Sequence, residues 1–409
     1  MRQHVDQALQ CGDVPRAARL AEHWVSRNPG DSLGWLVLSG VRARQAQFAD
    51  AIAAASRAAA IGMVASRGQP GKTEGHVLSL LSVENSWCDY SPRLGPRVPN
   101  TTDVNHAVPG CMKETFVLLN GEQIPWRQIR DKGPYTVIFN AITVAERTQR
   151  SLGQVREIAE ALQLPVINVP EEVARTSRAV NSRRYAGMRD ALFPRTESVS
   201  LKSHGRDAGH EVLRAAESRG FHYPLLVRWP GYNGSISLAL CDTPDAVVRL
   251  PWPRRVHEAL LIDFHDFKGG DGRYRKARIF SVGTQLMPHH LLMGDVWKLN
   301  ANDGSGLAYH YKAGPLQDEI LAYTRDWRAW AGERALSGLE EVRARTHLDF
   351  YGIDFTVLPD GRALIFELNP AMNMMVSFTA ADGKDMSVHR QTGRLRDRIF
   401  GAFAELVSR

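Results

Sequence analysis

Two carboxylates and an amide near the C-terminal end of the sequence could together bind a metal ion. Asp354 lies in the apolar stretch 352–355, and Glu367 and Asn369 lie in the stretch 366–370. Because an unpaired carboxylate is costly to bury, each of these acids needs a cationic partner. Residues two apart on a strand point to the same face, and a hairpin can place Asp354 opposite the other two. Three oxygen donors suit Mg²⁺, which also binds phosphate oxygens; the alternative is a pair of carboxylates bonded to arginines.

A cation followed by a glycine-bearing loop predicts a phosphate site. The apolar stretch 225–228 ends in Arg228, and the loop that follows contains Gly231, Gly234 and Ser235. Glycines allow backbone amides to approach phosphate oxygens closely. A strand that delivers a cation to such a loop is therefore suited to a nucleotide.

Basic residues are locally in excess in two parts of the sequence. Between residues 175 and 195 there are six arginines and one acid, and between residues 249 and 278 there are eight basic residues and four acids. Two interpretations are open. The segments form a solvated surface, or they line a cavity that holds a polyanion such as a nucleotide triphosphate.

The order of Asp354, a hairpin turn and then Glu367-x-Asn369 resembles the metal-binding end of the ATP-grasp superfamily. This superfamily includes glutathione synthetases, RimK-type ligases and D-alanine:D-alanine ligases. The resemblance implies that the three residues hold magnesium ions that bridge the ATP phosphates. It also implies that Arg228 stands where a family lysine contacts the nucleotide, and that Arg184, or the arginine before it, replaces the other lysine. Arginine in both places departs from the family pattern.

The same resemblance assigns an adenine-binding strand and a catalytic cation. The stretch 260–264 is similar to the strand whose backbone meets adenine, with Asp263 or Asp266 available for the ribose hydroxyls or else on the surface. Arg278 opens a strand that ends near a glycine, and its family role is to stabilise charge on the transferring phosphoryl group. Lys276 shares its strand face and is expected to help.

The reaction implied by the resemblance joins a carboxylate to an amine. With ATP and Mg²⁺ as cofactors, the carboxylate becomes an acyl phosphate, which an amine of a small molecule or peptide attacks to form an amide. A biosynthetic step on an amino acid or peptide, including peptide modification, fits this chemistry. The alternatives are an ATP-grasp phosphotransferase and a non-catalytic nucleotide-binding scaffold.

The elements that must position these residues follow from apolar runs and turn signals. A hairpin is expected from strands 352–358 and 363–368, because Pro359-Asp360-Gly361 between them is a turn signal. The stretch 86–110 is expected to be loops. Further strands are predicted at 77–83, 115–119, 136–139, 166–169, 225–228, 260–264 and 277–282, and helices over 148–162 and 317–345.

This alternation predicts an α/β layer with a largely parallel first sheet. The resemblance implies that the fold as a whole is of the ATP-grasp type, which is α+β in organisation. We expect a linker over 66–74, an α/β preATP-grasp domain over 75–180 and the ATP-grasp domain over 181–409. The last is divided into a lid at about 195–260 and a metal-binding core at about 261–409. The linker contains Gly71-Lys72-Thr73, but Pro70 and the absence of a preceding strand argue against a phosphate loop.

Residues 1–65 are expected to form a small all-α module. In a 34-residue frame that starts at Ser32, the positions of Trp35, Ala51 and Ala58 resemble those of a tetratricopeptide repeat, although Ser39 replaces the usual glycine. The run Arg275-Lys276-x-Arg278, followed by a segment with His, Trp and Asn residues, resembles a group that joins such repeats to an ATP-grasp domain, and this resemblance covers about three quarters of the chain. The module either docks a protein or peptide, or serves as a helical cap or a dimer contact, as in a homodimer.

Composition places the chain among ordinary globular proteins. It has 409 residues, 44% hydrophobic and 23% charged, and no apolar run long enough for a membrane span. We therefore expect a cytoplasmic protein with no membrane partner. The net charge of +7 is not gathered in one arm, so no nucleic-acid partner is expected. The four cysteines are scattered, and His289, His290 and His310 lack the close partners of a zinc site.

Overall fold

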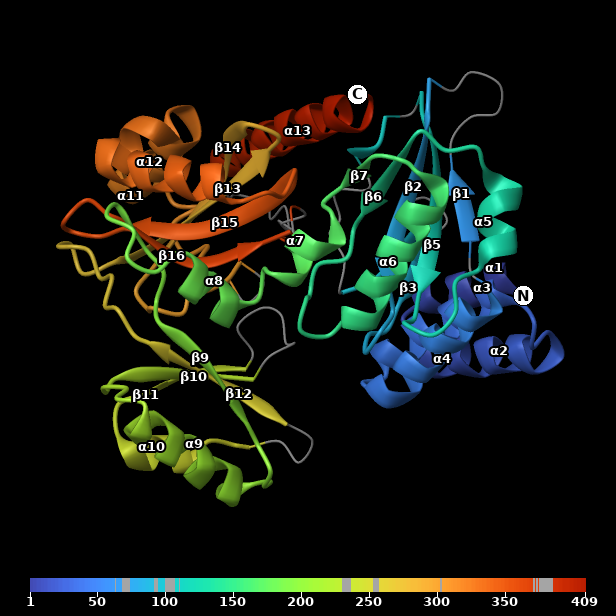
Figure 1. Cartoon of the computed structure of the whole chain (residues 1–409), viewed down its shortest axis with the longest axis horizontal. Coiled ribbons are helices and arrows are strands. Elements are labelled where there is room, and N and C mark those ends of the chain that lie inside the picture. The colour runs from blue at the N-terminus through green and yellow to red at the C-terminus, as the bar shows by residue number, and fades with distance from the viewer. Residues whose placement is uncertain are drawn as a thin grey trace.

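The computed structural model describes the chain with a few gaps. The described residues are 1–62, 64–67, 74–91, 95–99, 107–109, 111–229, 237–252, 257–301, 304–370, 372, 374 and 385–409. Within them, helices at the N-terminus are followed by three larger sheets, each with its own helices (Figure 1). No helix in these ranges is long and apolar enough to cross a membrane.

The N-terminal helices pack one after another through small side chains. Asp13 and Asp31 cap the second and third helices by accepting hydrogen bonds from backbone amides of the first turn. Ala55 and Leu36 are buried against the first sheet, so the module covers one of its faces. The helices are α1 (Arg2–Gln10), α2 (Val14–Arg27), α3 (Ser32–Arg44) and α4 (Phe48–Ile61). Their identity as tetratricopeptide repeats stays a prediction.

The first sheet is mostly parallel, as predicted, with an antiparallel edge strand. Its order is β1 (Val64–Arg67), β5 (Lys113–Leu119), β2 (His76–Ser82), β6 (Val137–Asn140) and β7 (Val166–Ile167). The central strand β2 is buried along its whole length, in keeping with its apolar sequence. Helices α5 (Trp126–Lys132) and α6 (Gln149–Leu162) complete this layer.

Two expectations for this region were wrong. Residues 66 and 67 of the predicted linker belong to β1, where the Ser66 hydroxyl hydrogen-bonds to that of Thr115 at 2.9 Å. The rejected Gly71-Lys72-Thr73 motif lies outside the described residues. The predicted loop region contains two short paired strands, β3 (Asp89–Ser91) and β4 (Gly95–Arg97), and Gly95, the first residue of β4, has a φ of +76°.

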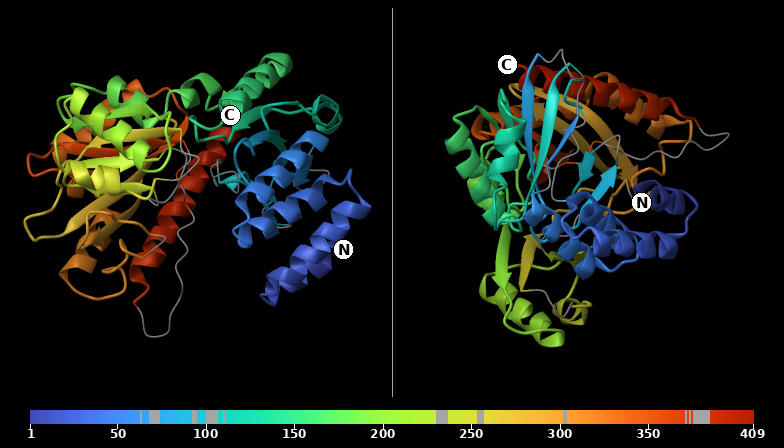
Figure 2. Two further views of the ribbon diagram at one scale, coloured as in Figure 1. Left: turned by 90° about the horizontal axis from the view of Figure 1, so that it is seen from below. Right: turned by 90° about the vertical axis from the view of Figure 1, so that its right-hand side faces the viewer.

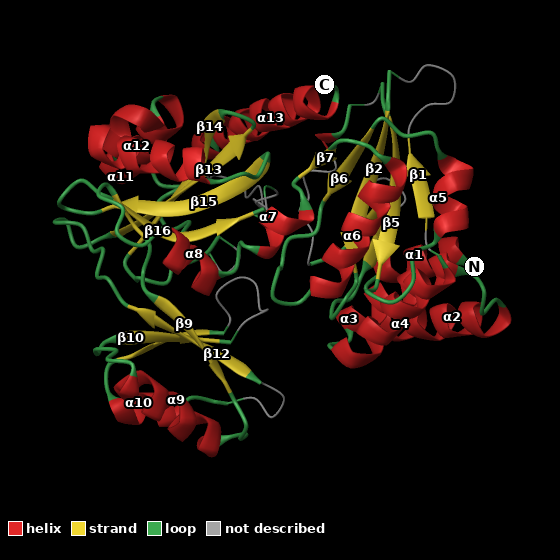
Figure 3. Ribbon diagram, in the orientation of Figure 1, coloured by secondary structure: helices red, strands yellow, loops and turns green. Residues whose placement is uncertain are grey.

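A four-stranded antiparallel sheet, which we call the lid sheet, follows. Its order is β11 (Leu238–Cys241), β10 (Leu225–Arg228), β12 (Glu258–Asp263) and β9 (Thr196–Ser200). Helices α9 (Arg206–Ser218) and α10 (Pro244–Arg249) pack on it around buried residues such as Val212 and Trp252. Figure 3 shows both helices on the side of the lid sheet that faces away from the rest of the chain.

The remaining sheet, the core sheet, carries the predicted hairpin. Its order is β14 (Gln285–Gly294), β13 (Tyr274–Val282), β15 (Phe350–Val357), β16 (Ala363–Asn369) and β8 (Ala191–Leu192). The helix expected over 317–345 is interrupted twice. Asp326 leaves helical geometry and caps α12 through Ala329, and Gly332, with a φ of +76°, breaks α12 near its start. In Figure 2, the long C-terminal helix lies beside β13 and β14. The helices are α7 (Pro170–Ala174), α8 (Arg178–Arg184), α11 (Pro315–Arg325), α12 (Trp327–Arg345) and α13 (Ser387–Val407).

Candidate active site

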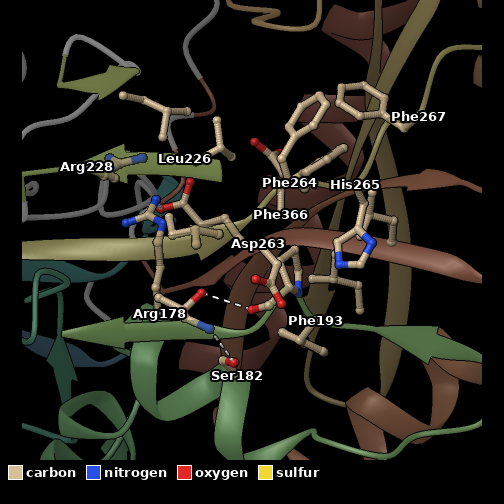
Figure 4. A pocket seen from close by; sticks show the side chains of 18 of the residues that line it. Arg178, Ser182, Phe193, Leu226, Arg228, Asp263, Phe264, His265, Phe267 and Phe366 are labelled. Carbon is tan, nitrogen blue, oxygen red and sulfur yellow. Dashed lines mark hydrogen bonds and ion pairs between the residues drawn. The ribbon is translucent and has the colours of Figure 1, made fainter. Parts of the chain in front are cut away.

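A pocket lies between the lid sheet and the core sheet. Strands β10 and β12 contribute to it from the lid, strands β13, β15 and β16 from the core, and α8 closes one end. Figure 4 shows that its two ends differ, with Arg178 and Arg228 at one end and Phe264, Phe267 and His265 at the other. Because lining residues come from segments distant in sequence, the site exists only in the folded chain.

The predicted carboxylates meet at the charged end of this pocket. Asp354 on β15 is the direct partner of Glu367 on β16, and both line the pocket. The register shifts just beyond this pair, so that Phe366 is an extra residue in a β-bulge, a feature common beside functional sites. Asn369 lies beside them, and its Nδ2 donates to Glu367 Oε1 at 3.2 Å.

Asp354 is held by two cations from the neighbouring strand. Nε and Nη2 of Arg278 donate to its Oδ1 and Oδ2 at 2.6 and 2.8 Å, and Nζ of Lys276 lies 3.6 Å from Oδ2. Asp354 is only 3% exposed. Burial alone would raise the pKa of this carboxyl, but the charges of Arg278 and Lys276 hold its pKa below the usual value. Asp354 therefore stays ionised.

Glu367 is held in the same way by arginines from other elements. Arg178, at the start of α8, donates to Glu367 Oε1. Burial would raise the pKa of Glu367, but the charges of Arg178 and Arg228 hold its pKa below its usual value. Arg228 is 7% exposed, and burial, followed by the charge of Arg178, lowers its pKa to about 10. Four described cations thus surround two carboxylates, which leaves a positive excess suited to a polyanion.

The other end of the pocket is apolar and aromatic. The rings of Phe267 and Phe366 lie 4.8 Å apart, and those of Phe264 and Trp297 lie 5.9 Å apart. Asp263 lies on the same lining. A flat heterocycle with polar edges matches such walls, since few polar groups on an apolar surface are typical of ligand sites.

The structure brings most of the predicted site residues together and leaves others elsewhere. Arg184 lies outside this pocket, because its guanidinium pairs with Glu172 and donates to the carbonyl of Arg345. Asp266 is exposed and caps a turn through Lys268. Inside the pocket or bonded to its lining are Lys276, Arg228, Asp263, Asp354, Glu367, Arg278 and Asn369. Gly231, Gly234 and Ser235 lie outside the described residues.

Three further residues line the pocket without having been predicted as site residues: Arg178, Trp297 and Lys298. The local arginine excess between residues 175 and 195 contained the signal for Arg178 without saying which arginine mattered. Its position at the start of a helix distinguishes Arg178 from the other arginines of this segment, because Ser177 caps α8 and Arg178 is the first residue of α8.

The donor set at the charged end fits a magnesium ion. Asp354 and Glu367 supply hard oxygen donors, and a carboxylate that accepts hydrogen bonds from a guanidinium keeps further lone pairs. Asn369, whose Nδ2 donates to Glu367 Oε1, adds an amide group to this donor set. Within the described ranges no three histidine, cysteine or acidic side chains gather as a metal site, so magnesium would depend on this mixed set and on phosphate oxygens.

No protein-family model and no curated protein sequence matches the chain. Among solved structures it is similar to a RimK-domain ATP-grasp protein from Sphaerobacter thermophilus, at 15% identity over 81% of this chain and 99% of that one, with a TM-score of 0.41. It is also similar to the D-alanine–D-alanine ligase of Coxiella burnetii, at 11% identity over 81% and 96%, with a TM-score of 0.40. The VanG D-Ala:D-Ser ligase of Enterococcus faecalis matches at 9% identity over 80% and 99%, with a TM-score of 0.42. At these values the likeness assigns no activity to the chain.

Proposed function

We propose that the chain binds Mg-ATP between the lid and core sheets and uses it to join a carboxylate to an amine through an acyl phosphate. One observation carries this proposal. The pocket has an aromatic end, and its other end places Asp354 and Glu367 among Arg178, Arg228 and Lys276. A nucleotide triphosphate matches both ends of the pocket, because its flat base fits the aromatic end and its strongly anionic phosphates fit the charged end.

Each end of the pocket has a role in this proposal. The adenine lies against the aromatic walls, and Asp263 accepts from the ribose hydroxyls. Arg178 and Arg228 bind phosphate oxygens, for which a planar guanidinium with several donors is well suited. Asp354, Glu367 and Asn369 would hold magnesium, which when bound neutralises charge on the phosphates.

The chemistry requires positioning and charge stabilisation more than a nucleophile. Arg278 is fixed by Asp354 before any substrate arrives, so its guanidinium can stabilise the charge that develops on the transferring phosphoryl group. Lys276 on the same strand adds a second cation. The amine then attacks the acyl carbon and phosphate leaves, which is a far easier departure than that of hydroxide.

The division of the chain belongs to the same proposal. The chain is divided into the helical module, the first sheet, the lid and the core, and the helical module docks a partner or covers the first sheet. The module and the first sheet share a buried cluster that includes Leu36, Ala58 and Phe116, which favours the covering role.

Product analysis tests the proposed reaction. The purified chain is incubated with Mg-ATP, the standard amino acids as carboxylates, and amines, and ADP, phosphate and new products are measured. A ligase forms ADP, phosphate and an amide only when both substrates are present. A phosphorylated product without free phosphate would indicate a phosphotransferase, and nucleotide binding without turnover would indicate a scaffold; either result would overturn the ligase proposal.

A further inference from the structure

A fourth side chain extends the row of charged residues across the core sheet. His290 on β14 is the direct partner of Arg278 on β13, Arg278 is the partner of Asp354, and Asp354 is the partner of Glu367. Directly opposed residues of antiparallel strands share a face, with Cβ atoms about 4.5–5.5 Å apart. Arg278 therefore has a carboxylate on one side and an imidazole on the other.

A second histidine is brought to the same point by a β-bulge. The register of β13 and β14 shifts next to Arg278, where His289 is the extra residue. The Nδ1 atoms of His289 and His290 are 2.6 Å apart. Such a hydrogen bond requires one Nδ1 with a proton and one without, so the two neutral imidazoles take opposite tautomers.

The surroundings keep this pair uncharged. His289 is 0% and His290 2% exposed. Burial, and then the charge of Arg278, lowers the pKa of His289 to about 3; burial, His289 and Arg278 also lower the pKa of His290. Among the described residues, the other charged and titratable groups near the pair are Lys276 on β13, Asp354 on β15, Tyr323 on α11, Arg396 on α13, and His310. The cations in this described set outnumber its carboxylate, so a protonated imidazole would be repelled.

We propose that His290, held by His289, is a positioning residue for Arg278. A neutral imidazole on one side of the guanidinium limits its movement without competing for its charge. Arg278 then stays directed at Asp354 and, under the proposed function on which this inference rests, at the terminal phosphate of ATP. If His290 only filled space in β14, its substitution would change the affinities for ATP and for ADP by the same factor.

Two variants of the full chain separate these roles. His290→Gln moves the amide away from His289, whereas His290→Asn places an amide near the lost Nδ1 and can restore that contact. His76→Gln is the matched control, because His76 is a buried, hydrogen-bonded histidine of the first sheet that does not line the pocket. Calorimetry at neutral pH with magnesium measures the affinity for ATP and for ADP, and thermal unfolding checks each fold.

We expect His290→Gln to weaken ATP binding about tenfold, the loss typical of a misplaced charged donor, and ADP binding less than about twofold. His290→Asn should recover most of the affinity, and His76→Gln should bind like the wild type. Equal losses for ATP and ADP, no loss, or no recovery with asparagine would overturn this role while leaving ATP binding intact. Absence of ATP binding by the wild type would instead overturn the proposed function, and this role with it.

Nitrogen NMR of the histidine side chains in the wild-type chain gives a test that does not depend on any variant folding. The two imidazoles should show opposite tautomers and no titration between about pH 5 and 8. Two identical tautomers, or titration of either ring in that range, would overturn the neutral pair and with it the positioning role.

Discussion

Arg278 and Asp354 face each other across β13 and β15, and two guanidinium nitrogens donate to the two carboxylate oxygens at 2.6 and 2.8 Å. This two-pronged geometry is among the strongest that a charged pair can adopt. It links the proposed catalytic cation to the proposed metal ligand before any substrate is present. Changes at either residue should therefore affect catalysis more than nucleotide affinity.

Arg278→Ala should lower turnover more than it lowers affinity for ATP. Loss of a preorganised donor costs about 2.7 to 4 kcal/mol, or roughly a hundredfold to a thousandfold in rate. Arg278→Lys should recover only part of this loss, because lysine keeps the charge without the forked geometry. Steady-state turnover and calorimetry on both variants measure the two effects. A loss of turnover below about threefold for the alanine variant would refute a catalytic role.

Asp354→Asn and Glu367→Gln should abolish magnesium-dependent turnover in chains that remain folded. Both substitutions keep the size of the side chain and remove its charge. The matched control is Asp360→Asn, in the exposed turn of the same hairpin, where the carboxylate bonds only locally with Arg362. Turnover is measured across a magnesium titration, and circular dichroism checks the fold. Wild-type turnover in either site variant would refute the metal assignment.

The hairpin was predictable from the sequence, but its partners were not. The turn at Pro359-Asp360-Gly361 and the apolar runs beside it predicted the two strands, and the register that pairs Asp354 with Glu367 confirmed the expected opposition. The arginine that binds Glu367 lies 189 residues away in sequence, and only the packing of α8 against the core sheet identifies it. A local sequence pattern does not show which residues so far apart in the sequence will form an ion pair.

Other differences have equally specific causes. Strand β14 was not predicted, because Pro288 and two histidines interrupt its apolar pattern. The strand is stabilised instead by packing of its buried side chains in the folded chain. Arg184 was assigned to the nucleotide from its place in a family pattern, but a bond to Glu172 directs it elsewhere. A basic side chain forms an ion pair with the carboxylate that lies nearest to it, and the folded structure is needed to identify that carboxylate.

Glu114 in the first sheet should make stability depend on pH. It is buried and paired with Arg67 and Ser79, yet burial raises its pKa to about 7 from 4.5. Because the folded chain binds this proton more tightly than the unfolded chain, the stabilisation is complete below pH 4.5 and is lost as the pH rises through about 7. The change amounts to about 3 kcal/mol.

Denaturant unfolding of the wild type and of Glu114→Gln between about pH 4.5 and 8 measures this effect. The variant should show a flatter dependence of the free energy of unfolding on pH. Glu122→Gln, at an exposed position, serves as the control. Parallel curves for wild type and Glu114→Gln would contradict the assignment.

Removal of α1–α4, with β1 retained, should leave the affinity for Mg-ATP within about twofold of the wild type, since no residue of these helices lines the pocket. The melting temperature should fall, because Phe116 and Leu81 of the first sheet lose their cover from Ala55 and Leu36. Calorimetry and thermal unfolding measure the two quantities. Complete loss of nucleotide binding in a folded truncation would show that the helices form part of the site.

The most direct test of the central claim is calorimetric titration of Mg-ATP into the wild type, Arg228→Met and Arg219→Met. Arg228 is buried in the pocket lining, whereas Arg219 lies on the lid surface beside Glu197. Methionine has a length similar to that of arginine, and Glu367 keeps its ion pair with Arg178 when Arg228 is replaced, so this carboxylate is not left unpaired and the fold should survive. We predict that the wild type and Arg219→Met bind alike and that Arg228→Met binds at least about tenfold more weakly. No binding by the wild type, or equal affinity in all three, would contradict a nucleotide site between the lid and the core sheet.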